Sequence, residues 1–274
     1  MLSEEIKTLV AERYNKFSRY GGVKRYRSPG NMGPGLGCIG QKLYTPDEIE
    51  KIPNFAFDYS MGCTTPTRLV EIKKDNVVLD IGCGVGIDVI LAAKKVGDKG
   101  RVYGIDISTW MIKRATKAAK KVGLQNVEFH VADMEKLPLK NSFVNIIISN
   151  GAINLSIDKV TVFNEAYRVM KPGGKMAIAD IVTSEKIDPR VLENFKTQWL
   201  GCMGGATSEE EYLNAIKDAG FKKIEVLSRR KLCPNELSMM VRCPGEDFTP
   251  APMKEDVEAI QGKVISIKII ASKL

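Results

Sequence analysis

The chain has 274 residues, of which 44% are hydrophobic and 27% are charged, a composition that is ordinary for a soluble globular protein. It contains no run of 18 apolar residues and it begins with an acidic amphipathic stretch, so we expect neither a transmembrane helix nor a signal peptide. The net charge of +8 comes from lysines spread over the polar faces of predicted helices, and this dispersal argues against nucleic-acid binding. We therefore predict a cytoplasmic protein with no membrane or nucleic-acid partner.

The first part of the chain, residues 1–72, is predicted to precede the main domain. Apolar residues at helical spacing predict a helix over residues 3–18. Residues 20–40 contain so many glycines and prolines that we expect a long irregular loop, either a linker or a lid over a site. Thr45 is followed by Pro46 and Glu48, which is the pattern of a capped helix start.

A strand followed by a glycine-rich turn begins the predicted core. Residues 77–81 are an apolar run rich in β-branched residues, three glycines follow at every second position, and a helix is predicted from residue 87. The spacing G-x-G-x-G differs from the G-x-G-x-x-G pattern that binds the pyrophosphate of dinucleotides. Asp80 stands directly before the turn and would repel a phosphate, whereas it could accept hydrogen bonds from an ammonium group or a ribose. These features disfavour a dinucleotide oxidoreductase.

Strands and helices then alternate along the chain, which predicts a doubly wound, mostly parallel α/β sheet. We expect a tight turn at residues 171–174 and an edge strand, antiparallel to its neighbour, at residues 264–271. We divide the chain into segments 1–72, 73–230 and 231–274, which are an N-terminal lid, a core and a C-terminal extension. The other predicted strands are 101–106, 127–131, 143–149, 175–180, 223–226 and 238–242, and the helices are 109–122, 157–170, 190–200 and 209–219.

Polar residues stand at the ends of the predicted parallel strands, where ligands bind in open α/β sheets. Asp106 follows the last glycine of the turn by twenty residues, a distance that suits an acid binding ribose hydroxyls. Asp133 ends the next strand and could accept from an exocyclic amine, with Met134 packing on a base. Each acid alone could simply cap a helix. Three acids at consecutive strand ends favour a nucleoside site.

The combination resembles class I S-adenosylmethionine-dependent methyltransferases: the turn at 80–86, the acids at 106 and 133, and the segment Met-Lys-Pro-Gly-Gly at 170–174. The resemblance implies that Asp80 and the glycine turn hold the methionine part of the methyl donor, Asp106 the ribose and Asp133 the adenine amine. The predicted donor-binding set is Asp80, Gly82, Cys83, Gly84, Gly86, Asp106, Ile107, Asp133, Met134 and Asn150.

A narrower resemblance, over about residues 45–225, is to the arsenite methyltransferase family. It is carried by residues 53–63, by Ser-Asn-Gly-Ala-Ile-Asn-Leu-Ser-Ile-Asp-Lys at 149–159, and by Gly-Cys-Met-Gly-Gly-Ala at 201–206. In that family cysteine thiolates from three places hold trivalent arsenic. Cys63 and Cys202 match two of these places, but Gly151 stands where the family usually has the third cysteine.

The missing cysteine leaves the acceptor open. Soft thiolates suit arsenic(III) better than other side chains, so Cys63 and Cys202 are the candidate catalytic residues, and Cys38, Cys233 or a small thiol could supply a third sulfur. No resident metal site is predicted. The leading function is methyl transfer to arsenite, with a reducing thiol or thioredoxin as a candidate partner. The alternatives are methylation of a carbon, nitrogen or oxygen centre on an organic metabolite, and a non-catalytic nucleotide-binding protein.

Overall fold

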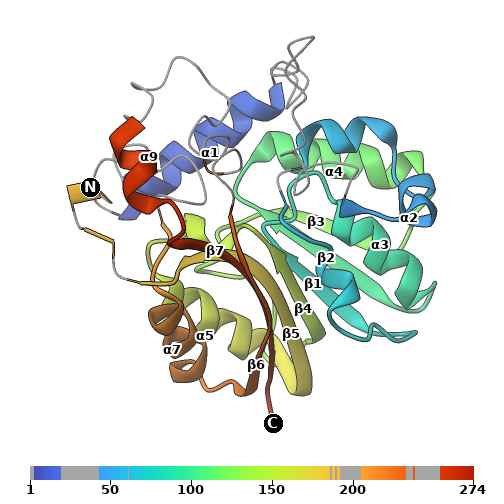
Figure 1. Cartoon of the computed structure of the whole chain (residues 1–274). Coiled ribbons are helices and arrows are strands. Elements are labelled where there is room, and N and C mark those ends of the chain that lie inside the picture. Colours follow the sequence, from blue (N-terminus) through green and yellow to red (C-terminus); the bar gives the residue numbers. More distant parts are fainter. Residues whose placement is uncertain are drawn as a thin grey trace.

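The computed structural model describes residues 3–19, 43–60, 62–185, 187–188, 190–191, 205–232, 237 and 254–274. Its centre is a seven-stranded sheet in the order β3-β2-β1-β4-β5-β7-β6 (Figure 1). The five strands from β1 to β5 pair in parallel, and β7 pairs antiparallel with both β5 and β6. The predicted fold class, a mostly parallel doubly wound sheet, is confirmed.

The parallel strands follow the sequence prediction closely. They are β1 (Val77–Ile81), β2 (Arg101–Asp106), β3 (Val127–Val131), β4 (Val144–Asn150) and β5 (Met170–Thr183). The chain runs from β1 outward to β2 and β3, and then returns to place β4 on the other side of β1. The carboxyl ends of β1 and β4 are therefore the point where the winding reverses, and this is where such sheets bind ligands.

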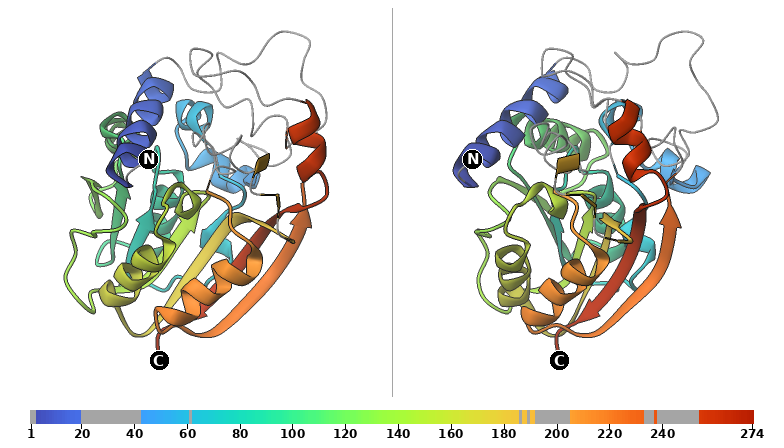
Figure 2. Two further views of the ribbon diagram at one scale, coloured as in Figure 1. Left: turned by 90° about the vertical axis from the view of Figure 1, so that its left-hand side faces the viewer. Right: turned by 60° about the vertical axis from the view of Figure 1, so that its left-hand side comes forward.

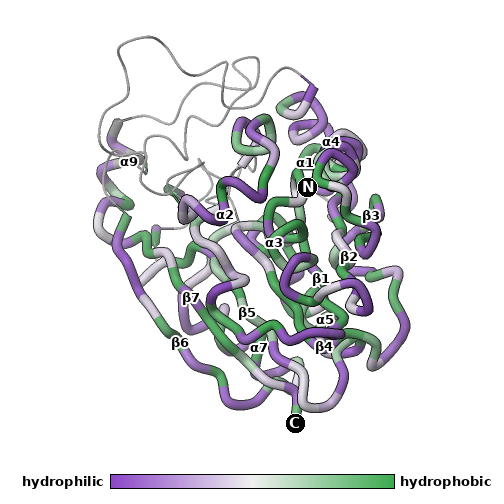
Figure 3. The backbone as a smooth tube through the Cα atoms, turned by 90° about the vertical axis from the view of Figure 1, so that its right-hand side faces the viewer, coloured by the Kyte–Doolittle hydropathy of each residue, from purple (hydrophilic) through white to green (hydrophobic). Residues whose placement is uncertain are grey.

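Helices cover both faces of the sheet. On one face α3 (Ile87–Val96) and α4 (Thr109–Lys121) pack against side chains such as Val78 and Ile146. On the other face α5 (Lys159–Val169) and α7 (Glu209–Asp218) pack against side chains such as Leu79. The burial of alternate residues of β1 on opposite faces follows from the alternation of side chains along a strand. The central strands and α3 are accordingly largely green in Figure 3.

The predicted edge strand at the end of the chain lies inside the sheet. β7 (Val264–Ser272) pairs with β5 on one side and with β6 (Lys222–Lys231) on the other, as Figure 2 also shows. The prediction of an antiparallel strand is confirmed, but the prediction of an edge is wrong. The polar residues that suggested an exposed face are not exposed, since Ser266 is buried and Lys268 is partly buried. β6 forms this edge instead, and its exposed charged residues suit a position that must not pair with another chain.

The predicted turn at residues 171–174 is part of β5. Met170 pairs with Val144 and Lys175 pairs with Ile146, so the intervening residues form an irregularity in the ladder, at which Gly173 has φ +78°. The glycine-rich segment 20–40 and the strand predicted at 238–242 lie wholly outside the described residues. The helix predicted at 190–200 lies mostly outside them. The described residues also form the 3₁₀ helices η3 (Asn54–Tyr59), η4 (Pro66–Arg68) and η5 (Ile153–Leu155), and the helix α9 (Lys254–Ile260).

The N-terminal segment lies over the α4 side of the molecule. α1 (Ser3–Arg19) packs along α4, and its Asn15 accepts hydrogen bonds from the Ser108 hydroxyl at 2.8 Å and from the Trp110 backbone N–H at 3.1 Å. The capping box that begins α2 (Pro46–Glu50) is present as predicted, with Thr45 and Glu48 bonded to each other's backbone N–H. In the part of the chain that the structure describes, no helix has the length and apolar character needed to cross a membrane. The division at residues 72 and 230 stays a prediction.

Candidate functional site

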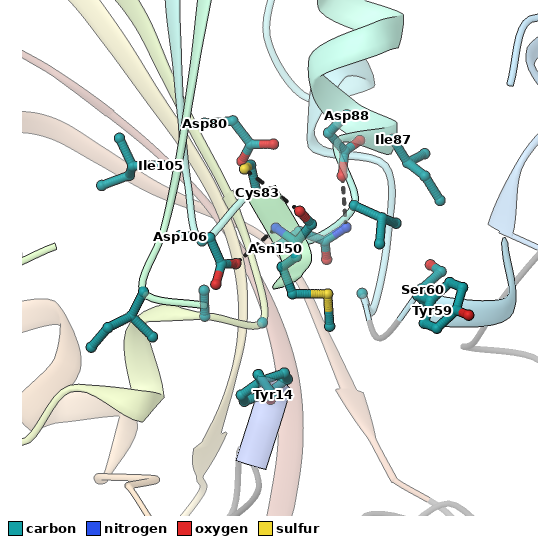
Figure 4. Close-up of a pocket in the computed structure, with 18 of the residues that line it drawn as sticks. Tyr14, Tyr59, Ser60, Asp80, Cys83, Ile87, Asp88, Ile105, Asp106 and Asn150 are labelled. Carbon is teal, nitrogen blue, oxygen red and sulfur yellow. Dashed lines mark hydrogen bonds between the residues drawn. The ribbon is translucent and has the colours of Figure 1, made fainter. Parts of the chain in front are cut away.

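A pocket opens above the glycine turn, at the carboxyl ends of β1, β2 and β4 (Figure 4). The turn is shaped by left-handed backbone at Gly82, Gly84 and Gly86, where φ is +73°, +52° and +79°. A Cβ atom on Gly82 would lie only 2.1 Å from the Cβ atom of Ala152, so the turn packs against the segment that follows β4. A Cβ atom on Gly84 would meet nothing within 4 Å. The turn therefore presents bare backbone to the pocket.

Three carboxyl groups surround the pocket: Asp80 and Asp88 are buried, and Asp106 is partly buried. Burial raises the pKa of Asp80 well above its usual value, and the charges of Asp88 and Asp106 raise this pKa further. Burial also raises the pKa of Asp88 to about 7, although a hydrogen bond from Asn150 acts to lower this pKa. The pKa of Asp106 is raised by burial to about 6, although its carboxylate accepts the backbone N–H groups of Ser108 and Gly84, each at 2.9 Å. None of the described residues lining the pocket is basic, so the site is prepared for a cation.

Two of these acids each have a carboxyl oxygen that makes no hydrogen bond to the described residues. Asp80 is 2% exposed and Asp88 is 6% exposed. Oδ1 of Asp80 and Oδ1 of Asp88 are both buried and have no hydrogen-bond partner among the described residues. A buried carboxylate oxygen without a partner is costly, and a ligand that donates hydrogen bonds would remove this cost. Figure 4 shows the Asp88 side chain hydrogen-bonded to Asn150, at 3.1 Å.

The helix α1 closes one side of the pocket. Its Val10 and Tyr14 are among the lining residues. One turn earlier, Lys7 Nζ lies 2.7 Å from Asp133 Oδ2 and 2.7 Å from Glu135 Oε2, on the loop after β3. Burial acts to lower the pKa of Lys7, but the hydrogen bonds and charges of these two acids raise it overall. The ammonium group thus ties α1 to the rim of the pocket.

We expect Lys7→Met to loosen α1 and to weaken ligand binding in the pocket several-fold. The substitution leaves two carboxylates without their cation, and partly exposed pairs of this kind contribute about 1 kcal/mol or less each. Faster hydrogen exchange in α1 is the direct measurement. Glu12→Gln is the control, because it removes a charge from an exposed position of the same helix. Unchanged exchange in the Lys7 variant would contradict this role.

Most of the predicted donor-binding residues come together in the pocket. Those that line it are Asp80, Gly82, Cys83, Gly84, Asp106, Ile107, Met134 and Asn150. Gly86 does not line it; it caps α3, and its N–H donates to the Cys83 carbonyl at 2.8 Å. Asp133 does not line it either. Its Oδ1 accepts from the Glu135 N–H at 2.9 Å and its Oδ2 meets Lys7. Contact of Asp133 with an adenine amine stays a prediction.

On the acceptor side, only part of the predicted set is described. Cys63 is half-buried in the turn before η4, and its N–H donates to Asn150 Oδ1 at 2.8 Å. Its side chain packs against an apolar cluster that includes Ile181 and Val264, and the residue does not line the pocket. Gly151 does line the pocket, with φ +72°. Cys38, Cys202, Cys233 and Cys243 lie outside the described residues.

Several lining residues were not predicted from the sequence as site residues. Tyr44 and Ser60 reach the pocket from the segment before β1, and Val10 and Tyr14 from the N-terminal helix. No local pattern distinguishes these from core residues, since only the fold brings them to the glycine turn. Asp88 had a usable signal: it is an acid in the first turn of the helix that follows the glycines.

Comparison with known proteins places this chain in a protein family. Residues 72–220, more than half of the chain, match the family model of a methyltransferase domain. The arsenite methyltransferase of Halobacterium salinarum is 34% identical over 183 residues, which are 67% of this chain and 46% of that protein. Human arsenite methyltransferase is 36% identical over 172 residues, which are 60% of this chain and 44% of that protein. The chain thus spans about half the length of these relatives.

Solved structures agree with this family. The arsenic(III) S-adenosylmethionine methyltransferase of Chlamydomonas reinhardtii has a TM-score of 0.62 and 26% identity, over 84% of this chain and 70% of that one. Geranyl diphosphate C-methyltransferase of Streptomyces coelicolor has a TM-score of 0.63 over 98% of both chains, but its 18% identity speaks only for the fold. The chain therefore belongs to the methyltransferase domain family and has the class I fold of S-adenosylmethionine-dependent methyltransferases.

Proposed function

We propose that the pocket binds S-adenosylmethionine and that the protein transfers its methyl group to a small acceptor, of which trivalent arsenic is the leading candidate. When bound, the donor supplies a methyl carbon made electrophilic by a positively charged sulfur. The observation that carries the proposal is the pair of unpartnered buried carboxylate oxygens in a pocket whose described lining residues include no basic side chain. This donor carries both a sulfonium and an ammonium charge, so the acidic pocket fits it.

The residues around the pocket would bind and orient the donor. Oδ1 of Asp80 is available to accept from an ammonium group, and the bare backbone of Gly84 allows close approach. The Asp106 carboxylate is held by two backbone N–H groups and keeps further lone pairs for hydroxyl groups. Val10 and Tyr14 of α1 line one side of the site and would limit the access of water there. The chain would contribute mainly by alignment, which can supply several kcal/mol of the barrier reduction.

Arsenic is favoured as acceptor by the relatives named as arsenite methyltransferases and by the matching positions of Cys63 and Cys202. The lone pair of thiolate-bound arsenic(III) would form the As–C bond as the C–S bond of the sulfonium breaks, so that the neutral thioether leaves and no proton has to be removed. This suits a chain whose one histidine, His130, lies in β3 with its Nε2 2.9 Å from Glu128. The arsenic is formally oxidised to arsenic(V) in this step, and a reducing thiol would return it to arsenic(III). A reducing thiol or thioredoxin as partner, and a cytoplasmic location, are part of this proposal.

One observation favours a second candidate, methylation of a carbon, nitrogen or oxygen centre on an organic metabolite. Gly151 lines the pocket and offers no side chain where the arsenic family usually has a thiol. Its φ of +72° is unfavourable for any residue with a Cβ atom, so the backbone there is adapted to glycine. A bulkier organic acceptor would have room at this place.

The test is to incubate the protein with labelled S-adenosylmethionine, arsenite and a reducing thiol, and to detect methylated arsenic. We expect turnover by the wild type and loss of turnover in both Cys63→Ser and Cys202→Ser. Cys243→Ser is the control, because Cys243 is neither a proposed arsenic ligand nor a predicted donor-binding residue. Donor binding without arsenic turnover would reject arsenite and favour the organic acceptor. No donor binding would reject the methyl-transfer proposal.

A further inference from the structure

The side-chain amide of Asn150 uses all of its hydrogen-bonding capacity within the protein. Its Oδ1 accepts from the backbone N–H groups of Cys63 at 2.8 Å and Thr64 at 3.3 Å. Its Nδ2 donates to the Thr64 carbonyl at 2.7 Å and to Asp88 Oδ2 at 3.1 Å. A carboxamide has two acceptor sites and two N–H groups, so these four bonds saturate it. The reversed orientation would set N–H against N–H and oxygen against oxygen, so the environment allows one orientation only.

These bonds join three parts of the chain that are distant in sequence. Asn150 ends β4, Cys63 and Thr64 form the turn before η4, and Asp88 lies in the first turn of α3. The neighbouring glycine makes this contact possible, because a Cβ atom on Gly62 would lie 2.3 Å from Nδ2 of Asn150. The backbone of the Cys63 turn is therefore hydrogen-bonded directly to a residue that lines the donor pocket.

The Cys63 side chain has a separate set of contacts. It packs against the apolar cluster formed by Ile181, Ile187, Leu232, Leu237, Ile260 and Val264. The turn thus contacts the wall of the donor pocket through its backbone and this cluster through the Cys63 side chain. A displacement of the Asn150 amide would shift the thiol relative to the pocket, and small errors of alignment are costly for group transfer.

We infer that Asn150 is a positioning residue for the acceptor: its amide, oriented by Asp88, sets the Cys63 turn against the donor pocket, and it does not bind the donor. The inference rests on the proposed role of Cys63 in holding the acceptor. It differs from the expectation drawn from the sequence, in which Asn150 binds the donor. If Asn150 positions the Cys63 turn, its loss should change the reactivity of the Cys63 thiol and leave donor binding almost unchanged. If Asn150 binds the donor, its loss should weaken donor binding and leave the thiol unchanged.

The decisive variant is Asn150→Ser, which removes the amide without adding charge. The matched control is Asn145→Ser in the same strand, where the Asn145 side chain accepts the Val77 N–H at 2.9 Å far from the Cys63 turn. A third variant, Asn150→Asp combined with Asp88→Asn, exchanges the two functional groups and keeps the net charge. In it, one carboxylate oxygen at position 150 can still accept from the Cys63 turn, and the amide at position 88 can donate to the other oxygen, but the hydrogen bond to the Thr64 carbonyl is lost.

Two quantities are measured for each variant. The first is the Kd of S-adenosylhomocysteine, by calorimetry. The second is the rate of alkylation of Cys63 by iodoacetamide, followed by mass spectrometry of the peptide that contains it. We expect Asn150→Ser to raise the alkylation rate by at least about fivefold, as the loss of one net hydrogen bond implies, and to change the Kd by less than about threefold. The exchanged pair should bring the rate only part of the way back towards the wild-type value, because the hydrogen bond to the Thr64 carbonyl is not restored.

A rise of the Kd by about tenfold or more with an unchanged alkylation rate would overturn the inference and make Asn150 a donor ligand. An effect of Asn145→Ser as large as that of Asn150→Ser would overturn it as well, since general loosening would then explain both. The alkylation assay needs no arsenic. If the wild type fails to methylate arsenite while Asn150→Ser still exposes Cys63, the proposed acceptor is wrong and the positioning of the turn stands, so the two failures are distinguishable.

Discussion

Replacing Gly82 by alanine should weaken binding of the methyl donor strongly, by at least about tenfold more in Kd than the same replacement at Gly84. Both residues have left-handed backbone, with φ of +73° and +52°, so each alanine variant pays about 1 kcal/mol of conformational strain. Only Gly82 adds a collision, because its new Cβ atom would lie 2.1 Å from the Cβ atom of Ala152. Neither atom is at the end of a flexible side chain, so backbone must move.

A second substitution should relieve this collision. Replacing Ala152 by glycine leaves the Cα atom of residue 152 at 3.6 Å from the new Cβ atom, which is an ordinary van der Waals distance. We therefore expect Gly82→Ala with Ala152→Gly to recover the affinity of Gly84→Ala, while Gly82→Ala alone is worse by at least about tenfold in Kd, since overpacking costs about 1–3 kcal/mol. Calorimetry with S-adenosylhomocysteine measures all four proteins. Equal affinities for the two single variants would show that the approach of the turn to Ala152 does not shape the donor site.

The core of the fold could be predicted from the sequence because its signals are local. The run Val77–Ile81 is buried on both faces, and the glycines that follow leave no regular alternative, so the strand, turn and helix were correctly placed. Asp80 and Asp106 could be assigned to one site because parallel strands end at the same edge of a sheet. Ser108 caps α4 with its side-chain oxygen, and such a cap can be read directly from a sequence.

What the sequence could not provide depends on contacts between distant segments. The alternation of Ile and polar residues in Val264–Ser272 is the same for an edge strand and for a strand with a partner on each side, and only the location of β6 decides between them. Asn150 illustrates the same limit within the site. A polar residue at a strand end suggests a ligand contact, but its partners, the Cys63 turn and Asp88, are 87 and 62 residues away. Saturation of its amide is visible only in three dimensions.

The buried acids should make the protein less stable as the pH rises, and Asp88 should account for a large part of this loss. Its pKa is raised from 3.8 to about 7, chiefly by burial. The folded state therefore binds this proton more tightly than the unfolded state, so the stabilising contribution is complete below about pH 4 and is lost as the pH rises through about 7. A shift of about three units corresponds to about 4 kcal/mol in the free energy of unfolding.

Asp88→Asn should remove this dependence while it keeps the local structure, because an amide oxygen can accept the same hydrogen bond from Asn150 that Asp88 accepts at 3.1 Å. The free energy of unfolding, measured with denaturant at pH 4 and at pH 8, should fall less in the variant than in the wild type, by about 4 kcal/mol at most. Removal of the charge should also lower the pKa of Asp80, which Asp88 helps to raise. Asp98→Asn, at an exposed position, is the control and should leave the slope unchanged. If the free energy of unfolding of the Asp88 variant falls with pH as steeply as that of the wild type, Asp88 is not a source of the loss. A second measurement adds the cationic donor to the wild type. If the slope flattens in the variant and the donor stabilises the wild type more at pH 8 than at pH 5, the donor binds to ionised acids in the pocket.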